Sequence, residues 1–372
     1  MVAAAIATYL FCGGEYIRDE LVVRTQTRTL PDGAGDLQLD PLVALEMPRS
    51  ALQLSARYLP TLLLREPRER TTFSLLHRGT LAGTLRLSKD QRLRAEERLV
   101  SGSTDISWLG FPPDAPPPLV IRTFRSLPIG VFESSSSTSF EQAIRQHIHL
   151  SATARYSVSG GVSGEDRLTL PRVRTAALGA TGAWTGGRET FSLAITGAKG
   201  WVSTGTRTTF LGASSGWRHS FARGLDSEVA AGLSVLGGSA GETHGVVPTG
   251  SVSLRRETPT TRGALGGQIL LRWAPGFDAT TGLLRQRAEG SARLEFAPVR
   301  RLLLSAMGGV GVTPDVPPPE ARVLTQGAMG VAYTLSPAFA LSLGVRVVTL
   351  PGVEWAGVVG TTFSEQGGFR LP

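Results

Sequence analysis

The amino-acid sequence predicts an all-β protein, a transmembrane antiparallel up-and-down β-barrel of about 16–18 strands. Three observations predict this fold class. Long runs alternate between apolar and polar side chains, the connections between the runs are short and long in turn, and aromatic residues gather at the ends of the apolar faces. The chain of 372 residues also has 45 glycines and 23 prolines spread along its length, which is typical of many short elements separated by turns.

Strict alternation over runs of about ten to fourteen residues is the dominant pattern. In the run 148–159, Leu150 and Tyr156 share one face, while His149 and Arg155 lie on the other. A strand of this kind has two faces that contact different surroundings. The runs that we assign to strands are 16–29, 37–47, 51–63, 79–88, 91–103, 130–144, 148–159, 171–184, 188–201, 206–221, 225–236, 246–257, 262–273, 284–296, 300–312, 321–335, 339–349 and 353–363.

The connections between these runs fall into two classes that alternate along the chain. Short connections include Gly186-Gly187 and Ser336-Pro337, whereas longer ones include 64–78, 104–129 and 159–170. Up-and-down barrels in membranes have short turns at one end and longer loops at the other, so this alternation is expected of them. It places both chain termini at the end with the short turns.

Aromatic residues lie at or near the ends of the apolar faces, while the middle of those faces is often glycine or alanine. A membrane girdle produces this placement, because aromatic rings prefer the boundary between headgroups and hydrocarbon. Aromatic residues that pack at the strand ends of a soluble β-sandwich are the alternative. The girdle that we predict comprises Trp184, Phe191, Trp201, Trp217, Trp273, Phe296, Phe339, Trp355 and Phe363.

Composition excludes several other classes of protein. The chain is 41% hydrophobic, but no stretch approaches the roughly 18 uninterrupted apolar residues that a membrane helix requires. A closed barrel is the other structure that crosses a bilayer with its backbone fully hydrogen-bonded. The formal net charge is +8, yet the basic residues are scattered and form no dense tract, so we expect no nucleic-acid partner.

The N-terminal residues resemble the apolar part of a secretory signal. Residues 1–14 lack the positively charged beginning of such a signal, so we interpret them as a truncated signal segment, with a misplaced start or a lipoprotein signal at Cys12 as alternatives. Cys12 is the single cysteine, which excludes a disulfide within the chain. We assign 15–366 to a single barrel and 367–372 to a periplasmic tail.

With these features the chain resembles bacterial outer-membrane β-barrels of the porin-like class over nearly its whole length. The resemblance is architectural and implies residence in the bacterial outer membrane, with outer-membrane lipid and the barrel-assembly machinery as partners. Many such barrels end on an aromatic residue that the machinery reads, and Phe363 and Phe369 are both candidates here. Assembly into a homo-oligomer stays an open alternative.

Polar side chains on the opposite face of the strands are the candidate functional residues. A barrel of this size has room for a water-filled lumen, and arginines opposed to carboxylates across it would bias the passage of ions. Arginine outnumbers glutamate in the set, so we predict a mild anion preference. The predicted pore-lining residues are Gln53, Arg57, Arg155, Arg285, Arg287, Glu289, Arg293, Glu295 and Arg346.

Two segments were candidates for obstructing this lumen. The proline-rich segment 104–129 cannot extend a sheet, because proline lacks a backbone donor, and it either folds inward as a plug or lies outside. The 64–78 segment is predicted as a loop that could hold a short helix. The function expected is therefore passive or gated passage of small hydrophilic solutes or ions. The alternatives are a non-conducting structural or interaction barrel that acts as an anchor or as part of an export assembly, and a soluble all-β protein.

Catalysis is not expected from this sequence. No third group can be named that would orient His149 as a base for Ser151. His149 lies on a predicted strand and His147 at the turn before it, so we do not expect the two to share a metal ion. We therefore predict no enzyme activity, no metal and no cofactor.

Overall fold

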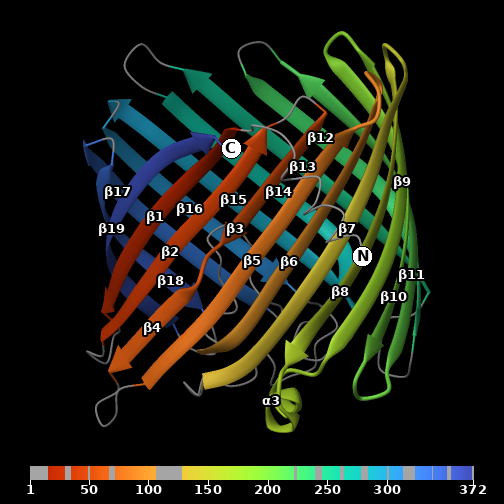
Figure 1. Ribbon diagram of the computed structural model, residues 1–372. Helices are drawn as coiled ribbons and strands as arrows, with labels where there is room; N and C mark the ends of the chain where they lie inside the picture. The colour runs from red at the N-terminus through yellow and green to blue at the C-terminus, as the bar shows by residue number, and fades with distance from the viewer. Residues whose placement is uncertain are drawn as a thin grey trace.

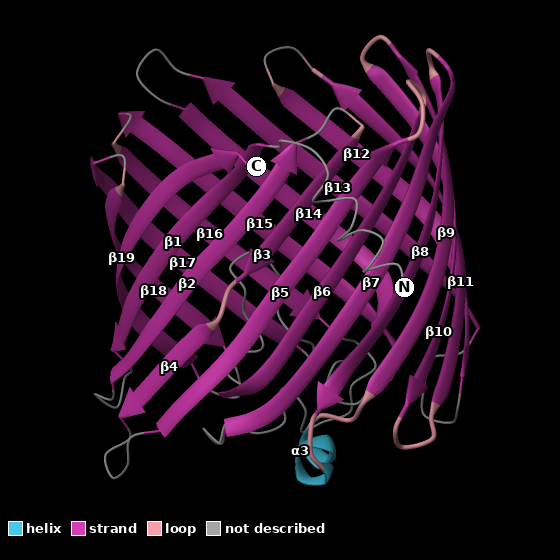
Figure 2. Cartoon of the chain, in the orientation of Figure 1, coloured by secondary structure: helices cyan, strands magenta, loops and turns pink. Residues whose placement is uncertain are grey.

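A closed, tilted β-barrel makes up nearly all of the described chain (Figure 1). The computed structural model describes residues 16–29, 35–48, 51–66, 72–105, 128–221, 224–238, 245–259, 264–277, 284–299, 301–312, 323–336, 338–349 and 353–370. Strands dominate these ranges, and one short helix, α3 (Gly164–Thr169), lies beyond the barrel rim (Figure 2). No helix in these ranges is long and apolar enough to cross a membrane.

The strands follow one another around the wall in chain order. Their bounds are β1 (Tyr16–Thr29), β2 (Gly35–Pro48), β3 (Leu52–Tyr58), β4 (Thr61–Glu66), β5 (Thr72–Arg86), β6 (Gln91–Asp105), β7 (Pro128–Arg145), β8 (Ile148–Gly161), β9 (Val173–Gly186), β10 (Glu189–Val202), β11 (Arg207–Ser220), β12 (Leu225–Gly238), β13 (Gly245–Pro259), β14 (Ala264–Phe277), β15 (Leu284–Val299), β16 (Leu302–Val312), β17 (Val323–Ser336), β18 (Phe339–Thr349) and β19 (Val353–Arg370).

Antiparallel pairing between β1 and β19 closes the sheet. Tyr16 lies opposite Arg370 and Thr29 lies opposite Gly357, so the two strands pair along the whole length of β1. The sheet has 19 strands, but β3 and β4 both pair with β2 on one side and with β5 on the other, so they occupy one position in the wall. Nineteen strands less one shared position leaves 18 wall positions, which confirms the prediction of an antiparallel up-and-down barrel of 16–18 strands.

A proline divides the run predicted at 51–63 into β3 and β4. Pro60 lies between the two strands and has no backbone N–H to donate to the ladder. The neighbouring Leu59 keeps a hydrogen bond from its N–H to the Arg78 carbonyl, at 2.8 Å. The wall therefore stays hydrogen-bonded to β5 across the break between β3 and β4.

The prediction of a loop over 64–78 was wrong. Strand β4 reaches Glu66 and β5 already begins at Thr72, and Leu64 lies opposite Phe73 in the antiparallel pairing. Only the connection 67–71 lies outside the described residues in this part of the chain. The sequence pattern does not reveal this strand, because leucines at the adjacent positions 75 and 76 hide its alternation.

The two ends of the barrel differ in the length of their connections. The turns at 146–147, 187–188 and 221–224 lie at the end where β1 begins and β19 ends, which is at the top of Figure 1. The connection from β8 to β9, with α3, lies at the opposite end, and so do the end of β6, the start of β7 and the short turn after Val202. Most of the predicted plug, residues 106–127, lies outside the described residues, and β7 begins at Pro128. Strand β19 continues past Gln366, the predicted edge of the barrel, to Arg370.

The outer face of the wall is apolar. Side chains such as Leu193, Leu343 and Met329 are 62%, 61% and 73% exposed, and they share alternate strand positions with other large apolar residues. A concave recess opens on the other set of alternate positions, including Gln53 and Arg155. The apolar set therefore lies on the convex surface, where an exposed hydrophobic band is expected of a barrel that crosses a membrane.

Predicted girdle residues lie on this outer face at both ends. Near the short turns, Phe191 lies opposite Trp184 on β9 and opposite Trp217 on β11, and the Trp184 and Phe191 rings are 5.9 Å apart. Phe339 and Phe363 face each other in the same zone, with Phe296 near the end of β15. Trp201 and Trp273 lie toward the opposite end, and the side chain of Trp355 lies outside the described residues.

The separation of the aromatic zones matches a membrane. From Phe191 to Trp201 is 201 − 191 = 10 residue steps along β10. At about 3.3 Å a step this is about 33 Å along the strand, and about 25 Å along the membrane normal for a tilt of about 40°. That height is the thickness of the apolar band of outer-membrane barrels.

One carboxylate interrupts the outer band. Glu97 lies on the same face of β6 as Leu93 and Leu99, and its oxygens accept hydrogen bonds from the hydroxyls of Ser134 and Ser136 on β7. Because both oxygens have donors, the cost of placing the carboxylate on an apolar surface is partly offset. The β6–β7 face therefore carries a satisfied polar group within the outer apolar band.

Close approach of neighbouring strands gives a stability prediction. A Cβ at Gly232 would lie 2.2 Å from the backbone oxygen of Ala213, whereas a Cβ at Gly79 would meet nothing within 4 Å. We expect Gly232→Ala to lower the free energy of unfolding by about 1–3 kcal/mol, because β11 and β12 must move apart. Gly79→Ala is the matched control and should leave stability nearly unchanged. Urea unfolding of the refolded barrel followed by tryptophan fluorescence measures both, and equal midpoints for the two variants would contradict this packing.

Candidate functional site

The inner wall holds a recess with an excess of positive charge. Strands β3 and β5–β8 line it, and its volume is about 840 Å³. The ionisable residues in its lining are four arginines and one glutamate, namely Arg86, Arg92, Arg94, Arg155 and Glu96. Since the sheet is closed, this surface faces the interior of the barrel, and the charge of its lining is net positive.

Several of these charged groups contact neighbours on the wall. Arg94 lies 3.5 Å from a carboxylate oxygen of Glu141 on β7, and Arg98 forms an ion pair with Glu96. Arg155 donates from its Nε to the Ser135 hydroxyl at 3.3 Å. Hydroxyl contacts fix a guanidinium without neutralising it, so Arg155 keeps its full charge toward the lumen.

Arg86 is also held by an uncharged partner. Its Nε donates to the Ser88 carbonyl at 3.3 Å, in the turn between β5 and β6. Arg86 and Arg155 therefore contribute positive charge to the recess that no carboxylate in these contacts cancels. This distinguishes them from Arg94 and Arg98.

Strand β15 carries a second set of charges. Arg287 pairs with Glu289, and Arg293 pairs with Glu295 at 2.6 Å, each within one face of the strand. The Arg287 and Glu289 side chains are only 14% and 16% exposed, whereas Arg293 and Glu295 are open to the interior. Arg285, on the same face, is buried.

These two charged regions lie on opposite sides of the barrel. With β3 and β4 counted as one position, β6 is the fifth of the 18 wall positions and β15 is the fourteenth. The difference, 14 − 5 = 9 positions, is half the circumference. The charges of β6 and β15 therefore face each other across the lumen.

The inner wall is far less accessible toward the long connections. Thr208 and Ser234, both on inward positions there, are 0% and 2% exposed. Leu76, Ile129, Val131 and Leu170 form a buried apolar cluster at the same end. The lumen is therefore more open on the side of the short turns and more closely packed on the side of the long connections.

A capped helix covers part of that packed end. The α3 N-cap, Ser163, accepts a hydrogen bond from the Asp166 backbone, and Asp166 accepts in return from the Ser163 hydroxyl and backbone at 2.6 and 3.0 Å. Asp166 also accepts from the Gly130 backbone at 3.1 Å, which ties α3 to β7. A side chain at Gly130 would collide with this carboxylate, since its Cβ would lie 2.7 Å from an oxygen.

The structure places the predicted pore-lining residues at three locations. Gln53 and Arg155 lie in the recess, and Arg57 lies farther along the same face of β3. Arg285, Arg287, Glu289, Arg293 and Glu295 lie together on β15. Arg346 lies on β18, and its side chain lies outside the described residues.

Sequence reasoning missed the charged residues that dominate the recess. Arg92, Arg94 and Glu96 lie on β6, and Arg86 lies at the end of β5. The alternation Arg-Leu-Arg-Ala-Glu from Arg92 was available as a signal. It was obscured because Glu96 and Glu97 are adjacent, so one carboxylate falls on each face and neither face is uniform.

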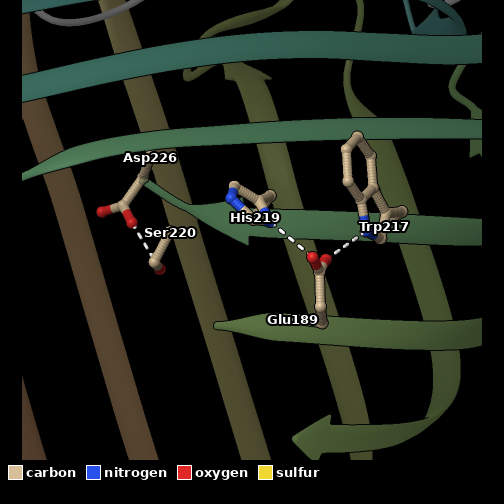
Figure 3. A network of polar contacts seen from close by, with 5 residues as sticks. All are labelled: Glu189, Trp217, His219, Ser220 and Asp226. Carbon is tan, nitrogen blue, oxygen red and sulfur yellow. Dashed lines mark hydrogen bonds and ion pairs between the residues drawn. The ribbon is translucent and has the colours of Figure 1, made fainter. Parts of the chain in front are cut away.

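A polar network lies at the short-turn end of β10, β11 and β12, as Figure 3 shows. Glu189, the first residue of β10, accepts from Trp217 Nε1 and contacts His219 Nδ1, both at 2.5 Å. Nearby, the Ser220 hydroxyl donates to Asp226 at 2.6 Å. The contacts fasten β10, β11 and β12 where their short turns begin, so we assign them a structural role.

No metal site is apparent in the described part of the chain. No three His, Cys, Asp or Glu side chains gather there in an arrangement that could hold a metal ion. His147 lies in the turn between β7 and β8, and His149 lies on the inward face of β8.

A closed antiparallel barrel with an apolar outer band and a charged interior is the architecture of bacterial outer-membrane β-barrels of the porin-like class, and this chain has that fold. OpdK from Pseudomonas aeruginosa, solved with vanillate, is similar, with a TM-score of 0.51, 11% sequence identity, and coverage of 94% of this chain and 99% of that one.

Two further outer-membrane proteins of Pseudomonas aeruginosa match less well. OccK5 (OpdH) has a TM-score of 0.47 and 10% identity, and OpdL has a TM-score of 0.46 and 15% identity, each with coverage of 96% of this chain and 99% of the other. No family model matches the sequence, and no curated protein is similar to it in sequence. At these identities the likeness concerns the fold, and it rests on OpdK.

The α3 cap gives a pH prediction. Hydrogen bonds, chiefly from the Ser163 hydroxyl, hold the pKa of Asp166 below its ordinary value of 3.8. Because folding lowers this pKa, the ionised carboxylate stabilises the cap above pH 3.8, and the stabilisation is lost as the pH falls below that value. We expect the hydrogen-exchange protection factors of the Gly130 and Leu170 amides to fall over that range.

In Asp166→Asn the protection should be low and should show no such step, whereas Glu165→Gln, one residue away, should keep it. An unchanged profile in Asp166→Asn would show that the cap does not depend on this carboxylate.

Proposed function

We propose that this chain is a porin-like channel of the bacterial outer membrane that passes small hydrophilic solutes or ions with a preference for anions. The recess on the inner wall, with four arginines and one glutamate, is the observation that carries the proposal. Solutes would be selected by size and charge, with no bond made or broken.

The charge arrangement supports an anion preference. Arg86 and Arg155 hold their positive charge toward the recess through neutral partners, while the charges of β15 on the opposite wall are largely paired. An anion in the lumen would therefore be drawn toward the β5–β8 side. Vanillate, with which OpdK was solved, is a carboxylate, and small carboxylates are the class of solute that a guanidinium-rich wall suits.

The unequal openness of the two ends supports restricted passage. Solutes from the short-turn side would enter an open, charged vestibule and then meet the packed zone around Thr208, Ser234 and the apolar cluster. A narrow zone with apolar residues limits flux by size and by the cost of dehydrating an ion. We therefore favour small solutes and low conductance over a wide, general pore.

Single-channel recording in a planar bilayer tests the proposal. The refolded, heat-modifiable barrel should give discrete current steps, and its reversal potential in a salt gradient should indicate anions. A barrel that inserts but stays silent would contradict the proposal and favour the non-conducting structural role.

Charge variants test the assignment of the recess. Arg86→Gln combined with Arg155→Gln should move the reversal potential toward cations, because the two changes remove positive charge from the recess. In these contacts no carboxylate loses a partner. Glu289→Gln should move it the other way, since it leaves Arg287 less neutralised. Arg256→Gln, on the outer face, is the matched control and should have no effect. Shifts of equal size in the control and the recess variant would exclude the recess as the source of selectivity.

A further inference from the structure

Three cations surround a tryptophan on the outer face at the long-connection end. Arg174 on β9 lies directly opposite Trp201 on β10, and Arg207 on β11 lies opposite Trp201 from the other side. Lys199 occupies the preceding outward position of β10, and its Nζ lies 5.5 Å from the centre of a Trp201 ring. The cations Arg174, Lys199 and Arg207 are exposed, and we call these three residues with Trp201 the outer basic cluster.

The spacing of the cluster suits a phosphate-bearing headgroup. Arg174 and Arg207 are two strand spacings apart, about 10 Å between backbones, and Lys199 lies about 7 Å along the strand from Trp201. Flexible side chains of this length can converge on one phosphate or hold two adjacent ones. Arginine binds phosphate through paired N–H groups, and lysine adds a compact charge.

The cluster lies at the level of lipid headgroups. Trp201 is about 25 Å from the Phe191 zone along the membrane normal, by the strand geometry of β10. Tryptophan prefers this boundary, and basic residues beside it reach the headgroup phosphates. The end with the longer loops faces outward in outer-membrane barrels, so these headgroups belong to the outer leaflet.

Nine outward positions at this end of β9–β11 carry no acidic residue. At this end those positions are 174, 176 and 178 on β9, 197, 199 and 201 on β10, and 207, 209 and 211 on β11, and none of these nine is acidic. At the other end of the same strands the outward position is Glu189, with Trp217 and His219. The outer face of β9–β11 is therefore basic only where it meets the outer leaflet.

We propose that Arg174, Lys199 and Arg207 bind the phosphate groups of a phosphorylated glycolipid in the outer leaflet, with Trp201 as the interfacial anchor. The site lies on the outside of the wall, away from the lumen, so it is independent of whether the barrel conducts. Bound lipid would bridge three adjacent strands from outside at the end where the Glu189 network does not reach.

The lysine content of the chain supplies the test. Lys89 and Lys199 are the only lysines, and Lys89 lies in the turn between β5 and β6 at the opposite end, with its side chain 85% exposed. Amine acylation followed by peptide mass spectrometry therefore reports on the cluster and carries an internal reference. In zwitterionic micelles, added bisphosphorylated lipid A should slow acylation of Lys199 and leave Lys89 unchanged.

Matched ligands separate phosphate binding from simple coverage by lipid. The same lipid without phosphates should give no protection, and inorganic phosphate at the same concentration should give none either. Protection by the dephosphorylated lipid, or equal slowing at both lysines, would overturn the proposal. Equal protection by inorganic phosphate would overturn the assignment to a lipid.

Variants then test the partner residues. Arg174→Gln and Arg207→Gln should each weaken the protection of Lys199 by lipid A about fivefold, from the usual contribution of one basic residue near anionic lipid. Arg256→Gln, an outward arginine at the short-turn end, should leave the protection unchanged. Heat-modifiable migration of each variant verifies that the barrel is folded. Full protection in the Arg174→Gln/Arg207→Gln double variant would contradict the site.

Discussion

The requirement that every backbone polar group be hydrogen-bonded governs this structure. A membrane interior offers no water to an open sheet edge, so a sheet there must close on itself. Here closure is the pairing of β1 with β19, from Tyr16 opposite Arg370 to Thr29 opposite Gly357. Once the wall is closed, each strand has one face toward lipid and one toward the lumen. The alternation of side chains then determines which residues are exposed on each face.

Charge is sorted by the same alternation. Inward positions of β5–β8 and β15 carry arginines and glutamates, and the pairs on β15 are mostly satisfied within the strand. The described outer face is mainly apolar, and its polar exceptions include Glu97 with its two serines and the basic cluster around Trp201. These exceptions differ in kind, because Glu97 is satisfied by its own neighbours while the basic cluster is directed at the headgroup layer.

Much of the fold could be predicted from the sequence because alternation is a local property. The run 148–159 and the short turns follow from it directly. Segment 64–78 could not be predicted, because Phe73, Leu75 and Leu76 break the alternation although they lie in β5. The composition of the recess was harder to predict than the strands. Gln53, Arg94 and Arg155 come together only through the register of β3 and β5–β8, and the local sequence pattern does not determine that register.

The pairing of β1 with β19 also means that the wall has no first strand. Its eighteen positions form a ring in which the pairing of the two terminal strands is as continuous as that of any hairpin. Chain order is then a matter of synthesis and not of architecture. A circularly permuted chain, joined between Arg370 and Tyr16 and opened at the Gly187 turn, would have the same neighbours, the same register and the same two faces.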